Sequence, residues 1–332
     1  MQTNPIATRD IVVIGASAGG VYALKELVSA LPADFPASIF VVLHVSANEP
    51  SHLPEILRHA GKLPVSHPSD GESIQRGHIY VAPPDHHLLV EHNQVVVMRG
   101  PKENRFRPSI DALFRSAAYS YGPRVIGVVL TGMLDDGTSG MWSIKRLEGV
   151  SVIQEPQEAL YPSMPESVRQ HVAIDYSVPI AQLASLLGEL VQEEVGERPS
   201  LSKQEEDRMA KEVKITQEDT AMEMDIFNLG ELSTLTCPEC HGTLVSIQEG
   251  TLTRYRCHTG HGFTPKSLLS GVNQTVEDAL WISIRALEET VMLLEQAAKG
   301  LEDTSTSATA YTNKVSQAQE QLALLRSMVM GK

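Results

Sequence analysis

A serine stands among small residues near the start of the chain. The stretch "GASAGG", residues 15–20, places Ser17 in a GxSxG pattern. An apolar run precedes it and a helix-like pattern follows, which is typical of a strand-to-helix turn that exposes a nucleophile. The same pattern occurs in turns where the serine is only a small residue. A serine hydroxyl also needs a base to take its proton and an acid to orient that base.

A histidine and an aspartate follow two other apolar runs. His44 ends "SIFVVLH", and Asp136 lies in "LTGMLDDG" just past a further run. If the runs are parallel strands, their carboxyl ends meet at one rim of the sheet, where this class of fold carries its chemistry. The residues therefore predict a triad of Ser17, His44 and Asp136. Alone, His44 is more often explained as a hydrogen-bonded, inert histidine at a strand end.

Two adjacent aspartates compete for the acid role. Either Asp135 or Asp136 can cap the helix that "GTSGMWSIKRL" predicts, and we expect the one outside the triad to cap that helix or face solvent. The chain order Ser, His, Asp differs from that of α/β-hydrolases, which place the acid before the histidine.

A second cluster lies far along the chain. "CPEC" and "CHTGH" carry the chain's three cysteines, Cys237, Cys240 and Cys257, and a Cys-x2-Cys spacing followed by a second Cys/His group is typical of structural zinc sites. We expect His261 as the fourth ligand, because three intervening residues let it converge with Cys257. His258 and His241 are the lesser alternatives, and three buried free cysteines are the alternative to a metal site.

These residues must be positioned by a sheet. Short apolar runs alternate with helix-length segments through the first half, which predicts an α/β fold with a doubly wound, mainly parallel sheet. The expected strands and helices cover 11–15, 21–31, 38–44, 51–60, 78–83, 125–132, 139–148 and 150–155.

The second half changes in texture. We expect a catalytic domain over 8–192, a charged linker over 193–229 with some helix, and a zinc-ribbon-like module over 230–270. A helical hairpin or coiled coil follows over 271–332, and its two helices pair either within one chain or between two copies as a homodimer. The turn between them is expected at "DTSTSATA". The helical stripes are Val276, Leu280, Leu287, Val291 and Leu294, then Val315, Ala318, Leu322, Leu325 and Val329.

Composition narrows the function classes. The 332 residues carry 41 acidic and 27 basic side chains, a net charge of -14, which argues against a dedicated nucleic-acid partner. No apolar run reaches the length of a membrane span and no leader pattern opens the chain, so we expect a cytoplasmic protein. Clustered rather than pairable cysteines agree with a reducing compartment.

Six ordered blocks give the chain a family resemblance. Over residues 8–192 it resembles the catalytic domain of CheB-type protein-glutamate methylesterases. The blocks are "IVVIGASAGGVYALKELVSALP", "FVVLHVS", "DGESIQRGHIYVAPPDHHLLV", "NRFRPSIDALFRSAA", "GVVLTGMLDDGTSGM" and "MPESV".

The resemblance implies a reaction and assigns roles. Ser17 would be the nucleophile, His44 the general base and Asp136, in the family's register, the orienting acid. The backbone N–H groups of Ala18 and Met133 would bind the oxyanion. The implied substrates are glutamyl methyl esters of methyl-accepting chemotaxis receptors, with deamidation of receptor glutamines in many members. No cofactor is implied for catalysis, and ribbons with trailing helices also extend some methylesterase-like proteins.

Other residues near the expected cleft are candidates for substrate contact. Arg105 and Arg107 lie in a block that resembles the family's cleft segment and could engage an acidic receptor surface, although the adjoining Pro-Ser pair could simply open a helix. His87 follows a strand end, and a polar turn explains it equally well.

The sequence also departs from the family. Ala18 replaces a common threonine, Val45 a frequent methionine and Leu134 a glycine. The usual receiver domain cannot fit before Ile11, so we expect control, if any, to come from a separate regulator.

Three other functions remain in contention. A nucleotide-binding domain is disfavoured because "GASAGG" lacks the GxGxxG spacing and the P-loop lysine. A degenerate methylesterase scaffold in a signalling complex and a hydrolase of another ester or amide are the remaining alternatives to the receptor methylesterase.

Overall fold

A seven-stranded sheet organises the first half of the chain. The computed structural model describes residues 7–217, 224–299 and 306–331. Every pairing in this sheet is parallel, and the strand order is β3-β4-β2-β1-β7-β8-β9. The strands are β1 (Ile11–Ala16), β2 (Ser38–Leu43), β3 (Val65–Ser66), β4 (Ile79–Val81), β7 (Val125–Val129), β8 (Val150–Gln154) and β9 (Tyr176–Val178).

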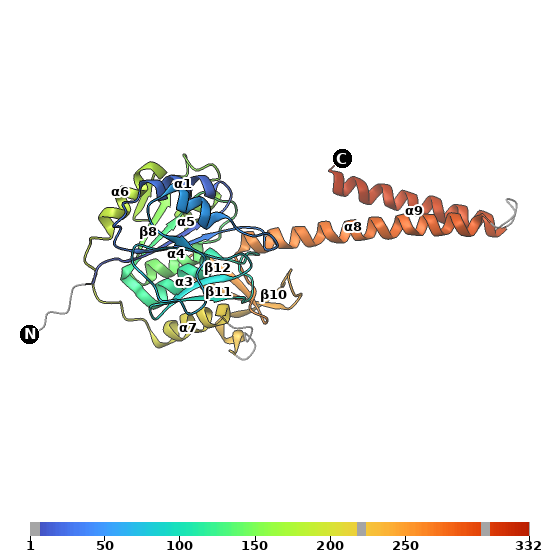
Figure 1. Cartoon of the computed structure of the whole chain (residues 1–332). Helices are drawn as coiled ribbons and strands as arrows, with labels where there is room; N and C mark the ends of the chain where they lie inside the picture. Colours follow the sequence, from blue (N-terminus) through green and yellow to red (C-terminus); the bar gives the residue numbers. More distant parts are fainter. Residues whose placement is uncertain (1–6, 218–223, 300–305, 332) are drawn as a thin grey trace, which may run out of the picture. The chain divides into compact units, whose positions relative to one another are not determined.

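Helices bury both faces of this sheet. Alternate side chains of β1 point to opposite faces, so Val12 and Ile14 enter one core and Ile11 and Val13 the other. Figure 1 shows α1 and α6 on one side, and α3 and α4 on the other. The predicted doubly wound fold is confirmed. The helices are α1 (Gly20–Ala30), α2 (Leu53–Ala60), α3 (Ile110–Tyr121), α4 (Thr138–Arg146), α5 (Ser163–His171) and α6 (Ile180–Leu190).

The strand order reverses at β1. The chain runs from β1 outward through β2 and then returns to add β7 on the opposite side. The loops after β1 and β7 therefore face each other across a topological switch point, the place where such sheets bind ligands. A separate antiparallel hairpin, β5 (His87–Glu91) and β6 (Gln94–Met98), packs beside α3.

The charged stretch 193–229 contains a long helix. α7 (Lys203–Gln217) packs on α3 and buries Met209, Glu212 and Val213, and the described part of the stretch resumes after residue 223. Beyond it lies a four-stranded antiparallel sheet of β10 (Glu231–Thr236), β11 (Thr243–Glu249), β12 (Leu252–Cys257) and β13 (Gly262–Phe263).

The chain divides into two compact units, 1–268 and 269–332. The second consists of most of α8 (Pro265–Ala298) together with α9 (Thr306–Met330). Ile284 and Ala318 are buried, and Arg326 pairs with Glu288, so the two helices pack on each other. The first residues of the expected turn, 303–305, lie outside the described residues. None of the helices described is long and apolar enough to cross a membrane.

Candidate active site and metal centre

Ser17 follows the last residue of β1. Its N–H donates to the Thr131 carbonyl at 3.0 Å, which ties the turn to the segment after β7. Both the Ser17 turn and the segment after β7 need a glycine. Gly19 has φ 77°, and a Cβ on Gly132 would lie 2.9 Å from the Ser17 Cβ and 2.1 Å from the Met164 sulfur.

His44 joins the serine to an acid. Its Nδ1 lies 3.2 Å from Ser17 Oγ, and its Nε2 lies 2.8 Å from Asp136 Oδ2. Because a carboxylate only accepts, Nε2 carries the proton and Nδ1 presents a lone pair to the serine. The Phe106 ring stacks on the imidazole with centroids 3.7 Å apart, and the His44 side chain is 3% exposed. The imidazole is thereby held in one plane between the serine and the aspartate.

Asp136 is held by six donors. Its carboxylate accepts from His44 and from a ring of groups at the start of α3. Burial opposes its ionisation, but the hydrogen bond and charge of His44 and the N–H of Ile110 outweigh burial and lower its pKa. A helix N-terminus also favours a negative charge. The other donors are Asn104 Nδ2 at 2.9 Å, Ser109 Oγ at 3.0 Å, and the N–H groups of Ile110 at 2.7 Å, Asp111 at 3.1 Å and Gly137 at 3.1 Å.

Asp135 points elsewhere. It is buried, and its carboxylate accepts from Thr264 Oγ1 at 2.8 Å. Burial raises its pKa to about 6 despite that hydrogen bond. The expectation that the second aspartate faces solvent or caps the helix with its side chain is wrong, because residues from beyond position 260 cover it.

The backbone near Ser17 is fixed by one side chain. Thr131 Oγ1 donates to the Ala18 carbonyl at 3.0 Å, and it accepts from the Tyr161 N–H at 2.9 Å. Met133 lies two residues further on with an exposed side chain, followed by Leu134 at φ 63°. The peptides of Ala18 and Met133 therefore belong to turns that Thr131 and Leu134 shape on either side of the serine.

The candidate substrate contacts have different surroundings. His87 is fully buried, with Nε2 2.9 Å from the Pro101 carbonyl and Nδ1 accepting from the Ser109 N–H at 3.2 Å. Its role as a substrate contact is corrected: both ring nitrogens are occupied inside the protein, and it supports the start of α3. Arg107 is paired with Asp85 at 2.6 Å, and Arg105 is partly buried.

Sequence reasoning missed the residues behind Asp136. Asn104 and Asp111 are both buried, and Asn104 Nδ2 donates to Asp111 Oδ2 at 2.8 Å. Burial and the charge of Asp136 raise the pKa of Asp111. The Pro-Ser pair at 108–109 is typical of a helix start, and a helix N-terminus attracts a carboxylate. This pair could have predicted that Asp136 lies against the start of α3.

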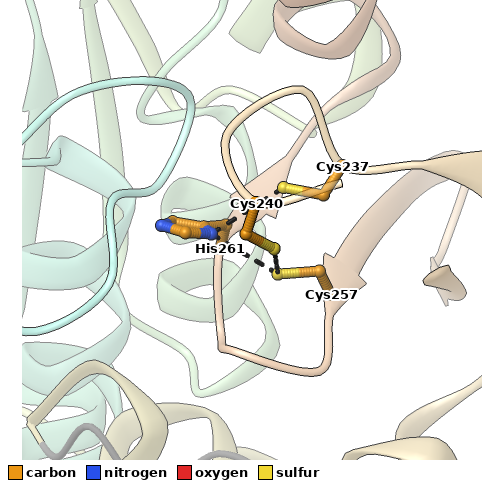
Figure 2. Close-up of side chains that lie close together, drawn as sticks. All are labelled: Cys237, Cys240, Cys257 and His261. Atoms are coloured by element: carbon orange, nitrogen blue, oxygen red, sulfur yellow. Dashed lines mark hydrogen bonds between the residues drawn. The ribbon is translucent and has the colours of Figure 1, made fainter. Parts of the chain in front are cut away.

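The four expected metal ligands converge. The sulfurs of Cys237, Cys240 and Cys257 and the ring nitrogen of His261 all lie within 4.8 Å of one another. Figure 2 shows the four side chains pointing toward one centre, from the β10–β11 loop, the end of β12 and the loop before β13. Three thiols and an imidazole make up a Cys₃His donor set, the kind that binds zinc, so the cluster can hold a metal ion.

The surroundings favour the thiolate at Cys257 but not at Cys237. Contact with Cys237 and then the proximity of His261 lower the pKa of Cys257, and the same contact with Cys257, together with burial, raises that of Cys237. His261 Nδ1 lies 3.5 Å from the Cys257 sulfur. A deprotonated thiol is the form that binds metal.

Known proteins are similar to the first half of the chain in sequence and in fold. The CheB methylesterase family model matches residues 12–187. A putative protein-glutamate methylesterase/protein-glutamine glutaminase of Leptospira interrogans (serovar copenhageni) is 35% identical over 190 residues, which are 57% of this chain and 98% of that protein. The protein-glutamate methylesterase/protein-glutamine glutaminase 4 of Myxococcus xanthus is 39% identical over 178 residues, which are 53% of this chain and 50% of that protein.

A solved structure agrees. The Thermotoga maritima CheB methylesterase catalytic domain aligns at 34% identity with a TM-score of 0.53, covering 56% of this chain and 100% of that one. The strand-end placement of the Ser17 turn, the parallel sheet and the matched half of the sequence lead to one assignment. The chain belongs to the CheB methylesterase family of hydrolases.

Proposed function

We propose that the chain is a serine hydrolase that removes methyl groups from glutamyl methyl esters of methyl-accepting chemotaxis receptors. The observation that carries the proposal is the continuous hydrogen-bonded path from Ser17 through His44 to Asp136. The names of the relatives supply the substrate class, since those proteins are called protein-glutamate methylesterases and protein-glutamine glutaminases.

The geometry suggests how the residues act. Ser17 Oγ attacks the ester carbonyl while His44 Nδ1 takes its proton, and ionised Asp136 stabilises the imidazolium that forms. The backbone N–H groups of Ala18 and Met133 bind the oxyanion. The imidazolium then gives its proton to the ester oxygen as the C–O bond breaks, which releases methanol, and a water activated by the same nitrogen cleaves the acyl-enzyme to glutamate. With a glutamine substrate the leaving group is ammonia.

The rim around Ser17 suits a protein substrate. Tyr22, Met133 and Leu160 are 74%, 57% and 72% exposed, although each is a large apolar side chain. Gly19 lies against Leu160, and Tyr22 and Leu160 line a hollow of about 250 Å³. Exposed apolar side chains grouped at one place are typical of a protein-binding surface. A receptor helix would cover them while it presents its side chain to Ser17.

Methanol release tests this proposal. We expect wild type to release methanol from methylated receptor membranes and Ser17→Ala to release none above background. Ser29→Ala, which removes an exposed hydroxyl from α1, should match wild type. Equal activity in wild type and Ser17→Ala would reject the serine mechanism. A wild type that reacts with a fluorophosphonate at Ser17 but releases no methanol would instead indicate another ester or amide substrate.

We also propose that the Cys₃His cluster holds a structural zinc ion. Four protein ligands fill a tetrahedral shell, and the open position that catalysis needs is then missing. The buried apolar cluster around the thiols is small and consists of Cys237, Leu244, Cys257, Phe263 and Leu268. A metal would supply part of the free energy that so small a core cannot provide. We therefore keep the proposed division of the chain into a catalytic domain (8–192), a linker (193–229), a zinc-ribbon-like module (230–270) and a helical hairpin or coiled coil (271–332).

Zinc content tests the ligand set. We expect one zinc per chain in wild type and in His258→Ala, because His258 lies outside the cluster. Cys257→Ser and His261→Ala should lose the ion or bind it at least about 10-fold more weakly. Elemental analysis after dialysis against a mild chelator measures this. Full zinc in both ligand variants would reject the site, and loss in His258→Ala alone would reassign the fourth ligand.

A further inference from the structure

Asn104 connects the triad to the C-terminal part of the chain. Its amide nitrogen donates to Asp136 Oδ1 at 2.9 Å and to Asp111 Oδ2 at 2.8 Å. Its amide oxygen accepts from the Thr264 N–H at 3.0 Å and from Ser267 Oγ at 2.9 Å. Asn104, Thr264 and Ser267 are buried. Both N–H donors and both lone pairs of the amide are therefore used.

This arrangement fixes which way the amide faces. If the amide turned over, its oxygen would face two buried carboxylates and its nitrogen would face the donors Thr264 and Ser267. Buried polar groups without partners cost about 1–3 kcal/mol each, so the observed orientation is strongly preferred. Thr264 and Ser267 thus decide that Asn104 donates toward Asp136.

The backbone reinforces the link. The Asn104 N–H donates to the Gly262 carbonyl of β13 at 2.8 Å, and the Gly262 N–H donates to the Lys102 carbonyl at 3.1 Å. Glu103 and Phe106 close the turn around Asn104 through paired backbone hydrogen bonds of 3.2 and 2.9 Å. Because Phe106 stacks on His44, β13 holds a turn that reaches two members of the triad.

We propose that the segment from β13 to the first turn of α8 completes the active site of this enzyme. Thr264 and Ser267 are positioning residues: they orient Asn104, which holds Asp136 in line with His44. The methanol assay of this effect rests on the function proposed above, because it assumes a methylated receptor as the substrate. The reactivity of Ser17 toward a small probe does not depend on that substrate.

A simpler role exists for the same two residues. Thr264 and Ser267 cap α8, because the Thr264 N–H donates to Ser267 Oγ at 2.9 Å and the Ser267 N–H donates to Thr264 Oγ1 at 3.1 Å. Losing a cap typically costs about 1 kcal/mol of stability and has no direct effect on a distant reaction. Ser202 and Glu205 form a comparable cap at α7 without contact to Asn104, which supplies a matched control.

A double-mutant cycle separates the two roles. Ser267→Ala should lower kcat about 10-fold with KM within about 2-fold of wild type, because only the reacting geometry is disturbed. Ser202→Ala should leave both values unchanged. In an Asn104→Ala background, Ser267→Ala should reduce kcat by less than about 2-fold further, since the effect passes through Asn104. The readouts are methanol release and the rate of Ser17 labelling by a fluorophosphonate.

Each outcome decides the proposal. It is overturned if Ser267→Ala labels at the wild-type rate, or if its effect persists in full when Asn104 is already alanine. Ser267→Thr keeps the hydroxyl and should retain at least half of the wild-type labelling rate, with circular dichroism as the folding check. Labelling as slow as in Ser267→Ala would contradict the proposal. If Ser17 of wild type is labelled but no methanol is released, only the proposed receptor substrate is wrong. If Ser17 of wild type is not labelled, both proposals are overturned.

Discussion

Asp135 and Asp136 are neighbours in sequence with opposite ionisation behaviour. Six donors surround Asp136, and its pKa is lowered although it is fully buried. Asp135 has one hydroxyl partner, and burial raises its pKa to about 6. The number and charge of the donors, rather than burial, separate the two carboxyl groups.

Replacing each aspartate should distinguish them. We expect Asp136→Asn to lower kcat by about 10³- to 10⁴-fold, because the amide cannot stabilise the imidazolium and favours the wrong tautomer of His44. Asp135→Asn keeps an oxygen that accepts from Thr264 and should change kcat by less than about 10-fold. Steady-state kinetics of both variants checks this, and an equal loss in both would remove Asp136 from its assigned role.

The raised pKa of Asp135 predicts a pH-dependent stability. The native state holds its proton up to about pH 6, whereas an unfolded aspartate releases it near pH 4. Stability from this group is therefore fully present below about pH 4 and is lost as the pH rises through 6. Asp135→Asn should be more stable relative to wild type at pH 7.5 than at pH 4, by on the order of 2 kcal/mol. Urea unfolding at the two pH values measures the difference, and a pH-independent difference would contradict the assignment.

The sequence predicts contacts between residues that follow strands of one sheet. It does not predict contacts between a loop and a helix that no common sheet relates. Ser17, His44 and Asp136 follow three apolar runs, so a parallel sheet brings them together. Their catalytic roles stay predictions. Asn104 and Ser267 are 163 positions apart, and no spacing rule relates a short turn to the first turn of a distant helix.

Three elements meet in a buried network of charges. α3 contributes Arg115, α7 contributes Glu212 and β12 contributes Arg254 and Arg256, while Glu103 lies in the turn before α3. Glu103 accepts from Arg115 at 3.1 Å and from Arg256 at 2.7 Å. Glu212 accepts from Arg254 at 2.9 Å and from Arg256 at 2.7 Å. Burial works against ionisation of both glutamates, but the arginines outweigh it and lower the pKa of each.

Breaking this network at α7 should be costly. Glu212→Gln leaves Arg254 and Arg256 with less compensating charge, and removing one partner of a buried pair typically costs about 3–5 kcal/mol. Glu205→Gln, on the same helix, weakens a partly exposed pair with Arg146, keeps an amide oxygen that accepts from Ser202, and should cost less than about 1 kcal/mol. Denaturant unfolding of the two variants measures these losses. Equal losses of unfolding free energy would show that the buried network stabilises the protein no more than the partly exposed pair does.

The same network explains what the pattern of the chain could not predict. Continuous apolar runs identify the strands of a parallel sheet, because those strands are buried on both faces. The charged stretch 193–229 resembles a linker, since Glu212 gives no sign of being buried until its arginine partners are known. Helix stripes were more informative: Leu280 and Leu287 of α8 and Val315 and Leu322 of α9 are partly covered within one chain. Pairing of two copies stays a prediction, which light scattering tests.

Across the whole first unit, the family domain and the C-terminal segments share one interior. Buried Glu103 and Arg115 pair with each other and also with Arg256 and Glu212, and buried Asp135 accepts from Thr264. Glu103, Arg115 and Asp135 lie in the matched family region, residues 12–187, whereas Glu212, Arg256 and Thr264 lie outside it.

A chain shortened to residues 1–192 should therefore be less stable than the full protein. Losing the partners of Glu103 and the cover over Asp135 should cost at least about 3 kcal/mol, equivalent to roughly 6–12 °C in Tm. The temperature at which Ser17 loses its reactivity toward a fluorophosphonate measures this. Equal thermal profiles for the two chains would show that the domain is independent of its extension.

The amide of Asn104 also limits how such proteins can be rearranged in evolution. Its two faces serve two halves of the gene, so a catalytic half exchanged between relatives by recombination would meet Thr264 and Ser267 without having changed alongside them. A hybrid that lacks an asparagine at this turn would keep the triad residues but lose the buried hydrogen bonds that help to hold Asp136 in place. We therefore expect that exchanging one half of this chain for that of a relative lowers activity unless Asn104, Thr264 and Ser267 are all kept.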